Sequence, residues 1–239
     1  MLYLTGDTHG TNDILKLSDN FFPAKNNLSR SDYVLITGDF GGIWSGDEKD
    51  GEVLDFYSSQ PFTTLFIDGN HENFDLLNAY PIEEWNGGKI HRIRDNIIHL
   101  MRGQVFTIDG LTYFTFGGGL SIDKHLRKEH VSWWKEEYAS EEEKEEALLN
   151  LEKHNNKVDF IVTHTCPRIV KDGVLSRCIS LIGAKCDTEE FLDKILEKTD
   201  YRMWFCGHYH NDLYFEEYRI LFMYHEIVEI SAITNELSL

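Results

Sequence analysis

The chain has 239 residues, of which 41% are hydrophobic and 13% aromatic, enough for one sizeable core, so we expect a single domain over residues 1–239. Its 41 Asp and Glu residues against 23 Lys and Arg give a formal net charge of −18, which disfavours a long nucleic acid as a partner. The first residues show no basic segment followed by an apolar one, and no apolar run reaches the roughly 20 residues of a membrane span, so we expect a soluble, cytoplasmic protein.

The chain contains four cysteines, and none of them forms a Cys-x-x-Cys pair. Free cysteine is among the most buried residue types, and the sequence gives no sign of the oxidising compartment in which disulfides persist. We therefore expect four reduced thiols with a structural role, at Cys166, Cys178, Cys186 and Cys206.

Five short segments share one pattern, in which β-branched and aromatic residues precede a polar residue that glycine often introduces. This pattern is typical of buried strands whose carboxyl ends carry polar side chains. The segments cover residues 2–7, 33–39, 64–70, 158–164 and 201–208.

Helical patterns lie between several of these strands, at residues 11–19, 140–155 and 187–198. In the second segment Glu143 follows Ser140 by three residues, and in the third Glu190 follows Asp187 by the same spacing. This spacing predicts a capping box at the start of each of these two helices.

Two further segments alternate in the manner of β-hairpins. Residues 104–116 place Asp109-Gly110 between two alternating runs, which is the strongest short-range hairpin signal, and residues 213–224 predict a second hairpin. Strands and helices mixed with hairpins favour a sheet-rich α/β layer structure over an all-parallel barrel. We expect two packed sheets with helices outside them.

Polar side chains follow each of the five predicted strands. Because ligand sites in open α/β sheets gather at the carboxyl ends of strands, we expect these side chains to converge on one rim. The residues, in chain order, are Asp7, His9, Asp39, Asn70, His71, His164, His208 and His210.

This set of side chains is chemically consistent with bound metal ions. Asp7 and Asp39 held close together would repel each other, and divalent cations turn that cost into attraction. Carboxylate, amide and imidazole groups without a cysteine suit manganese, iron or zinc better than a calcium cage or a structural zinc. Two such ions about 3.5–4 Å apart could share a bridging carboxylate and a bridging hydroxide and displace a leaving group at phosphorus.

Each motif taken alone has an ordinary structural explanation. Gly38-Asp39 after a strand is usually a turn, and Asp7-Thr8-His9 fits an N-cap beside an ordinary histidine. Gly69-Asn70-His71-Glu72 is more specific, and His208 and His210 lie on one side of an extended segment. The five motifs together, each at a strand end, indicate one site.

The five motifs resemble the signature blocks of the calcineurin-like metallophosphoesterase superfamily, and they span most of the chain. The resemblance implies a four-layer α-β-β-α sandwich, in which two mixed sheets lie face to face between helices and a dinuclear metal site lies at the carboxyl ends of strands. The matching blocks are Gly6-Asp7-Thr8-His9-Gly10, Gly38-Asp39, Gly69-Asn70-His71-Glu72, Thr163-His164 and Gly207-His208-Tyr209-His210.

The resemblance also implies a role for each of these residues. The cofactor would be two divalent metal ions, manganese first, with iron, zinc or nickel as alternatives. His71 would not be a ligand; beside the metals it would stabilise the transition state or protonate the leaving oxygen. The ligands of the first metal would be Asp7, His9 and His210, and those of the second Asn70, His164 and His208, with Asp39 bridging both.

The implied reaction is hydrolysis of a small phosphomonoester, phosphodiester or nucleotide. A metal-bridging hydroxide would attack phosphorus while His71 assists the leaving group. Two divalent cations against two ligand carboxylates leave a local positive charge that attracts a phosphate even in an acidic protein. We expect Glu72 to cap the start of a helix or to contact the metal ligands, rather than to bind a metal ion itself.

The chain departs from the protein serine/threonine phosphatases of this superfamily after its second block. Those enzymes continue with Asp-Arg-Gly, whereas Asp39 is followed here by Phe-Gly-Gly-Ile-Trp. A phosphoprotein substrate is therefore disfavoured, and no partner of His71 is assigned. Candidate phosphate contacts are Arg168, Arg127 and Lys124, although an ordinary surface cation near a turn explains each equally well.

The tryptophans near these motifs allow two interpretations. Trp44 and the pair Trp133-Trp134 could stack on a nucleobase or form a lid, whereas core or inter-layer packing is the better interpretation of the pair.

Two alternatives to a small-molecule phosphoesterase stay open. A nuclease acting on DNA ends would require a basic surface, which this acidic chain without an obvious Lys/Arg cluster does not indicate. Non-catalytic scaffolds on the same fold tend to lack the catalytic histidine, whereas His71 is present. The natural substrate and the oligomeric state do not follow from the sequence.

Overall fold

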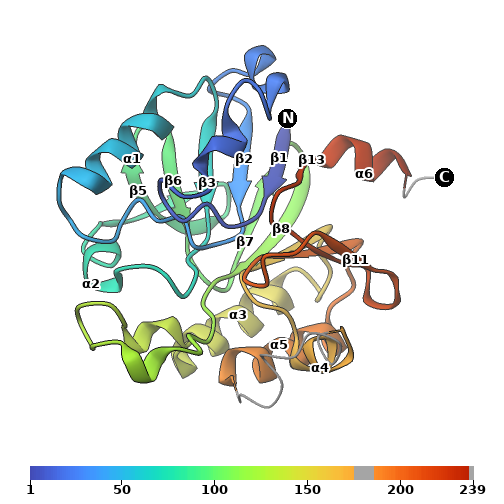
Figure 1. Cartoon of the computed structure of the whole chain (residues 1–239). Helices are drawn as coiled ribbons and strands as arrows, with labels where there is room; N and C mark the ends of the chain where they lie inside the picture. The colour runs from blue at the N-terminus through green and yellow to red at the C-terminus, as the bar shows by residue number, and fades with distance from the viewer. Residues whose placement is uncertain (175–185, 237–239) are drawn as a thin grey trace.

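The structure of the chain, a computed structural model, describes residues 1–174 and 186–236. Two mixed β-sheets pack face to face, and helices cover the outer face of each sheet (Figure 1). This arrangement confirms the expected four-layer α/β sandwich.

The first sheet has seven strands in the order β13-β1-β2-β3-β6-β5-β4. Strands β1, β2, β3 and β6 are paired in parallel, and the remaining pairs of this sheet are antiparallel. Its strands are β1 (Leu2–Thr5), β2 (Tyr33–Ile36), β3 (Thr63–Phe66), β4 (Ile82–Trp85), β5 (Gly88–Arg94), β6 (Ile97–Leu100) and β13 (Ile227–Glu229).

The second sheet has six strands in the order β11-β12-β10-β9-β8-β7. Its four central strands are paired in parallel, and the two outer pairs are antiparallel. Its strands are β7 (Gln104–Ile108), β8 (Leu111–Phe116), β9 (Phe160–Thr163), β10 (Met203–Cys206), β11 (Leu213–Phe215) and β12 (Ile220–Phe222).

Helices form the two outer layers. Val53 and Tyr57 of α1 pack against the first sheet, and Leu151 of α3 and Leu192 of α5 pack against the second. The α-helices are α1 (Glu48–Ser59), α2 (Phe74–Leu77), α3 (Glu141–Lys153), α4 (Arg168–Val174), α5 (Asp187–Lys198) and α6 (Ile230–Glu236). Short 3-10 turns are η1 (Ile14–Leu17), η2 (Pro23–Asn27), η3 (Lys124–Leu126), η4 (Lys135–Glu137) and η6 (Glu216–Tyr218).

The predicted strands and hairpins are confirmed. Each of the five strand segments contains a strand, and β7–β8 and β11–β12 form the two hairpins. Asp109 and Gly110 connect β7 to β8 with φ values of 51° and 79°. Positive φ at both central residues fits a type I′ turn, whose twist matches that of the flanking strands.

The helix predictions are only partly confirmed. Helix α3 has the full capping box between Ser140 and Glu143, whereas the box predicted for α5 is wrong because Cys186 is its N-cap residue and makes no side-chain cap. Asp187 instead contacts the ammonium of Lys144. Residues 11–19 also form no α-helix but the short turn η1.

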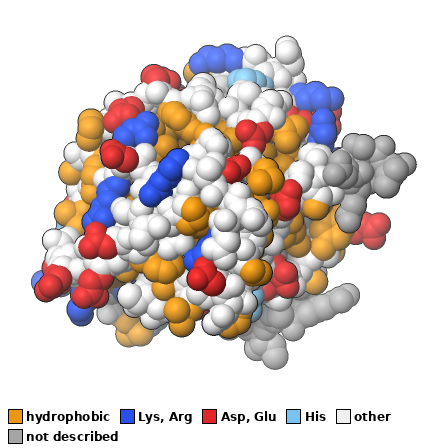
Figure 2. All heavy atoms as spheres, turned by 90° about the horizontal axis from the view of Figure 1, so that it is seen from above, with side chains coloured by type: hydrophobic (Ala, Val, Ile, Leu, Met, Phe, Trp, Pro, Cys, Tyr) orange, Lys and Arg blue, Asp and Glu red, His pale blue; other side chains and the backbone are white. Residues whose placement is uncertain are grey.

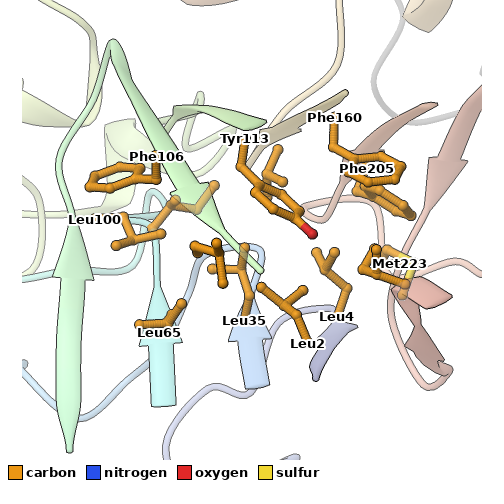
Figure 3. Packing of buried hydrophobic residues seen from close by; sticks show 14 of the residues in the cluster. Leu2, Leu4, Leu35, Leu65, Leu100, Phe106, Tyr113, Phe160, Phe205 and Met223 are labelled. Carbon is orange, nitrogen blue, oxygen red and sulfur yellow. The ribbon is translucent and has the colours of Figure 1, made fainter. Parts of the chain in front are cut away.

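The main core lies between the two sheets (Figure 3). Leu4, Leu35 and Leu65 from the first sheet face Phe160 and Phe205 from the second, and all five side chains are fully buried. Because β-strand side chains alternate between faces, the residues between them point to the helical layers, where they build the second and third apolar clusters.

A buried polar network lies just beyond the end of β3. The carboxylate of Asp68 accepts from the Arg102 guanidinium at 2.6 and 2.8 Å and lies 3.2 Å from Nε2 of His99. Nδ1 of His99 lies 3.1 Å from Nδ1 of His91. All four side chains are buried, so a charge pair and two imidazoles satisfy one another inside the fold.

The same arginine anchors the segment that follows β8. Arg102 donates to the backbone carbonyls of Glu136 at 2.7 Å and Tyr138 at 3.3 Å. Residues 117–139, named the cap segment from here on, are thereby fixed to the loop that follows β3.

The described cysteines are free thiols. Cys166, Cys186 and Cys206 are buried and make no disulfide, and burial raises the pKa of the Cys186 thiol to about 11. The prediction for Cys178 lies outside the described residues.

Charged side chains of both signs are scattered over the face shown in Figure 2, with hydrophobic ones between them and no continuous basic patch. Within residues 1–174 and 186–236, every helix is too short or too polar to cross a membrane.

Removing one buried side chain from the main core should destabilise the protein. Leu65 is fully buried, so Leu65→Ala should lower the free energy of unfolding by about 2–5 kcal/mol because it loses apolar contacts and leaves a cavity. Urea denaturation measures this change. The matched control is Leu149→Ala, since Leu149 is 57% exposed; an equal loss in both variants would contradict the assigned core.

The stability should also fall in mildly acidic solution, because burial and the neighbouring His99 lower the pKa of His91 from 6.5 to about 4. Between these two pH values the unfolded chain binds a proton that the folded chain does not, so stability decreases as the pH falls through this window. His91→Gln should show a flatter decline in urea midpoints between pH 7 and pH 4. His125 is exposed and supplies the control. His125→Gln should keep the wild-type slope of urea midpoint against pH, and a slope as flat as that of His91→Gln would contradict the role of His91.

Candidate metal and phosphate site

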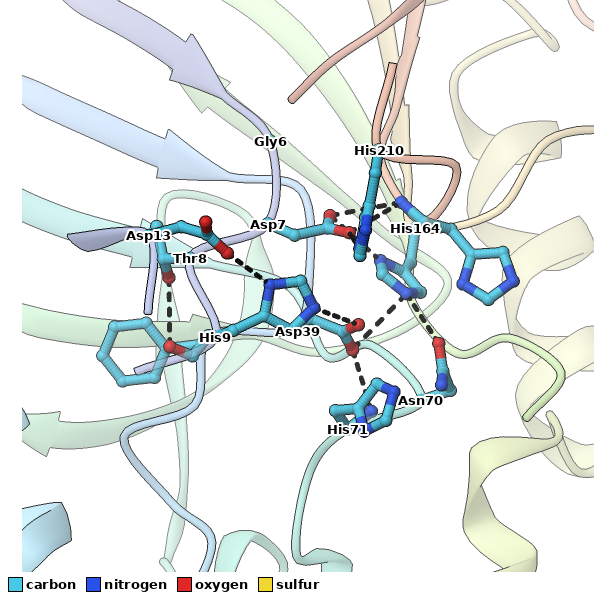
Figure 4. A network of polar contacts seen from close by, with 12 residues as sticks. Gly6, Asp7, Thr8, His9, Asp13, Asp39, Asn70, His71, His164 and His210 are labelled. Atoms are coloured by element: carbon cyan, nitrogen blue, oxygen red, sulfur yellow. Dashed lines mark hydrogen bonds and ion pairs between the residues drawn. The ribbon is translucent and has the colours of Figure 1, made fainter. Parts of the chain in front are cut away.

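The polar residues that follow five strands meet at one rim between the two sheets (Figure 4). Strands β1, β2 and β3 are parallel neighbours in the first sheet, and β9 and β10 are parallel neighbours in the second. Parallel neighbours end on the same side, and the face-to-face packing of the sheets brings both sets of ends together. The loops after these strands therefore carry all eight predicted side chains to the same place.

Asp39 lies at the centre of the cluster. Its carboxylate oxygens lie 3.3 Å from Nε2 of His9 and 3.5 Å from Nε2 of His164. One oxygen also accepts the backbone N–H of His71 at 2.8 Å. Asp39 is 2% exposed, so this carboxylate is removed from solvent and surrounded by imidazoles.

Asp7 forms a second buried carboxylate in the cluster. Its oxygens lie 3.3 Å from Nε2 of His210 and 3.8 Å from Nδ1 of His164, and they accept the backbone N–H of His208 at 3.0 and 3.2 Å. Two triplets within the described residues have ligand atoms close enough together to hold a metal ion: Asp7, His9 and His210, and Asp7, Asp39 and His164.

His164 connects the two halves of the site. Its Nδ1 lies 2.8 Å from the carbonyl oxygen of Thr37, and its Nε2 lies 3.0 Å from Oδ1 of Asn70. Its ring packs edge-on against His208, with centroids 4.9 Å apart. His164 is fully buried, so these contacts fix the orientation of its ring.

The backbone of the site is held in uncommon conformations. His9, Asp39, His208 and His210 have φ values of 43°, 48°, 69° and 49°, in the left-handed region that non-glycine residues rarely occupy. Such residues cost of order 1–3 kcal/mol each and concentrate at functional sites. Four of them in one cluster therefore favour a functional reading of these loops.

Glycine makes the close approach of the loops sterically feasible. A Cβ on Gly69 would lie 1.9 Å from Oδ1 of Asp39, and a Cβ on Gly38 would lie 2.2 Å from Nδ1 of His164. These two glycines of the sequence pattern thus have a physical reason: a side chain at either position would occupy the site.

The charged groups of the cluster perturb one another. Burial alone would lower the pKa of His9, but the hydrogen bond to Asp39 raises it to about 9. Burial is the main cause that lowers the pKa of His208 to about 3, and the charge of the nearby His164 acts in the same direction. Burial would raise the pKa of Asp39, yet His164 and His9 hold it far below its usual range. Asp39 is therefore anionic and His208 neutral, which are the forms that a divalent cation binds, whereas His9 holds a proton that a bound cation would have to displace.

His71 stands beside this cluster and contacts the cap segment. The guanidinium nitrogens of Arg127 lie 3.2 Å from both ring nitrogens of His71. Burial lowers the pKa of His71, and the charge of Arg127 acts in the same direction. Arg127 is held by Asp123 at 2.8 Å and by the carbonyl oxygen of Ser132 at 3.2 Å.

The other two candidate phosphate contacts have different surroundings. The Lys124 ammonium lies 3.8 Å from the ring centre of Trp133, and the Arg168 guanidinium pairs with Glu190 of α5 and with Asp172. Of the three cations, Arg127 is therefore the one whose contacts include His71.

The three tryptophans near the site have different surroundings. Trp133 and Trp134 are buried, which confirms core packing for this pair. Trp44 packs edge-on against Trp134, and its ring centre lies 6.2 Å from that of His71.

Sequence reasoning missed three residues that support the site. Asp13 lies 2.8 Å from Nδ1 of His9, Ser121 accepts from the Asn70 amide at 3.1 Å, and Lys16 donates to the carbonyl oxygens of Gly6 and Asp7. The spacing of four between His9 and Asp13 is a detectable local signal, whereas Ser121 lies 51 residues from Asn70 and has none. Glu72, for which ligation was disfavoured, is buried and accepts the backbone N–H of Phe40 at 2.8 Å.

Comparisons with known proteins agree with this geometry. A family model for calcineurin-like phosphoesterases matches residues 2–212. No curated protein sequence matches the chain. A solved structure from Staphylococcus aureus, a provisionally assigned 5′-nucleotidase in complex with alpha-ketoglutarate, is similar with a TM-score of 0.51 and 16% sequence identity. The match covers 95% of this chain and 49% of that one, so this chain spans about half its length, and the likeness concerns the fold alone.

The family match begins in β1 and extends beyond His210, so it includes all five strand-end motifs. Together with the two face-to-face sheets, this match shows that the chain belongs to the calcineurin-like phosphoesterase family.

Proposed function

We propose that this protein is a metal-dependent phosphoesterase that hydrolyses a small phosphomonoester, phosphodiester or nucleotide. The observation that carries this proposal is the convergence of Asp7, Asp39 and their imidazole neighbours on one buried rim, with His71 beside them. Family membership supports phosphoester hydrolysis with divalent metals in general. The choice of substrate, the metal and the residue roles are parts of the proposal.

The donor set fits divalent cations of the first transition row. Buried carboxylate oxygens, imidazole nitrogens and one amide oxygen suit manganese, with iron, zinc or nickel as alternatives. We propose two ions with Asp39 between them, because Asp39 contacts imidazoles on both sides. The proposed ligands are Asp7, His9 and His210 for one ion and Asn70, His164 and His208 for the other.

The residues around the ions would donate a proton and contact the phosphate. When bound, divalent cations supply positive charge to phosphate oxygens and lower the pKa of water. With its pKa lowered by burial, His71 is neutral near pH 7, and the approach of a phosphate anion stabilises its protonated form. His71 then holds the proton that the leaving oxygen needs. Arg127, held by Asp123 and Ser132, would contact a phosphate oxygen.

We also propose that residues 1–239 form a single domain. The core between the sheets combines Leu4 and Leu35 from the first part of the chain with Phe160 and Phe205 from the last part.

Replacing the central carboxylate or the neighbouring histidine should remove turnover. His71→Gln loses the proton donor, so kcat/KM should fall by roughly 10²–10⁴-fold, the usual effect of an acid–base group. Asp39→Asn loses a charge that binds cations and should lower kcat/KM at least as much. Turnover of p-nitrophenyl phosphate and bis(p-nitrophenyl) phosphate with manganese measures this loss. Chelation with EDTA should abolish the wild-type rate, and manganese should restore it.

Two results would count against this proposal. Asp39→Asn at the wild-type rate would refute the site. A wild-type protein that binds manganese but hydrolyses no phosphoester would indicate a scaffold on the same fold, whereas cleavage of single-stranded DNA in preference to small esters would indicate a nuclease.

Replacing Arg127 and replacing Arg168 should have different effects on the steady-state constants. Arg127→Ala should raise KM or lower kcat/KM by roughly 10–150-fold, since a hydrogen bond to a charged group contributes about 1.5–3 kcal/mol. Arg168→Ala, whose arginine pairs with Glu190, is the matched control and should leave both constants unchanged. A larger effect at Arg168 than at Arg127 would reverse the assignment.

A further inference from the structure

A cavity of about 710 Å³ opens beside the candidate site. His9 and His71 line it together with residues of the loop after β1, of the loop before α1 and of the first turns of α1. A smaller hollow of about 160 Å³ lies over Asp39 and Asn70, and His71 lines both. A phosphate held at the smaller hollow would therefore place one substituent in the larger cavity, whose volume is in the range of about 300–1,000 Å³ typical of small-molecule sites.

The indole of Trp44 forms an aromatic wall of this cavity and is fixed in place. Its backbone N–H donates to Asp50 at 2.7 Å, and its carbonyl oxygen accepts from the Asn73 amide at 2.8 Å. Its ring packs edge-on against Trp134 with centroids 5.4 Å apart, and the Trp134 indole N–H donates to Asp75 at 2.7 Å. A wall that is already ordered loses little entropy when a ligand stacks on it.

The charged residues that line the cavity are mainly acidic. The lining contains three carboxylates, from Asp47, Asp50 and Glu52, and one lysine, Lys49, in addition to the two histidines. Asp50 accepts the backbone N–H of Trp44, Asp47 accepts the backbone N–H of Lys49, and Glu52 is exposed. A second phosphate group would be repelled here, whereas hydroxyl and amino donors would find acceptors. The cavity thus suits a flat, uncharged group that carries hydrogen-bond donors.

We propose that this cavity binds the nucleoside part of a nucleoside monophosphate, with Trp44 as the residue that determines this specificity; the inference rests on the proposed phosphoesterase function. In the reaction, water adds to phosphorus, the bond between phosphorus and the nucleoside oxygen breaks, and that oxygen takes up a proton. The products are inorganic phosphate and the nucleoside. The base stacks on the indole, and the ribose lies nearer His71.

Steady-state kinetics on AMP, ADP, ribose 5-phosphate and phosphocholine test this proposal. The wild-type kcat/KM should be at least about tenfold higher for AMP than for ribose 5-phosphate, since the base adds one stacking contact. ADP should be a poorer substrate than AMP. Trp44→Leu, which keeps an apolar side chain without the aromatic plane, should bring AMP down to the level of ribose 5-phosphate, and Trp44→Phe should retain most of the preference.

Binding of adenosine alone supplies a readout that needs no hydrolysis. Calorimetric titration should show about tenfold weaker binding by Trp44→Leu than by wild type, from the loss of the stacked base. Phe21→Ala is the matched control: Phe21 is 73% exposed, and its removal should change neither adenosine binding nor the substrate preference.

The outcomes separate this inference from the function on which it rests. Equal rates on AMP and ribose 5-phosphate, with no effect of Trp44→Leu on their ratio, would overturn the nucleoside site and leave the phosphoesterase intact. A preference for phosphocholine would also overturn it, because the acidic wall would then select a cation. Adenosine binding that depends on Trp44, without hydrolysis of any ester, would support the cavity and sink the proposed function.

Discussion

Two carboxylates buried at the seam between the sheets are the constraint on which the rest of the structure depends. Asp7 is fully buried and Asp39 nearly so, in a shell of imidazoles and backbone N–H groups. Isolated charges of this kind are costly in a protein interior, and they persist because protonated or metal-bound partners compensate them. The raised pKa of His9 and the lowered pKa of His208 show the cluster dividing positive charge among its members.

The fold brings the two buried carboxylates together through the parallel direction of its strands and through glycine at a few positions. Parallel strands in two packed sheets deliver five loops to one rim, and glycines such as Gly69 let the loops approach within van der Waals distance of the carboxylates. The left-handed backbone at His9 and Asp39 turns each chain sharply after its strand. Strain at these residues is offset by the burial of large aromatic side chains in the layers behind them.

The sequence predicts what depends on local pattern. Strand ends, the Asp109-Gly110 turn and the Ser140 capping box follow from spacing and residue type alone. Contacts across the fold decide the remainder: residues 11–19 form only a 3-10 turn, with the Lys16 ammonium bound to backbone carbonyls of two other loops, and Asp187 contacts Lys144 instead of capping its helix. Three cations that were equivalent in sequence differ in structure because their acidic and aromatic neighbours come from distant segments.

The anchoring of the cap segment has an evolutionary consequence. Arg102 grips it through the carbonyl oxygens of Glu136 and Tyr138, which every residue type possesses. Substitution of exposed side chains in the segment therefore leaves these two hydrogen bonds intact, while Asp68 holds the same guanidinium on the loop that leads to Asn70. During evolution, the residues of the cap segment that contact the substrate could therefore change while the proposed metal ligands stay the same.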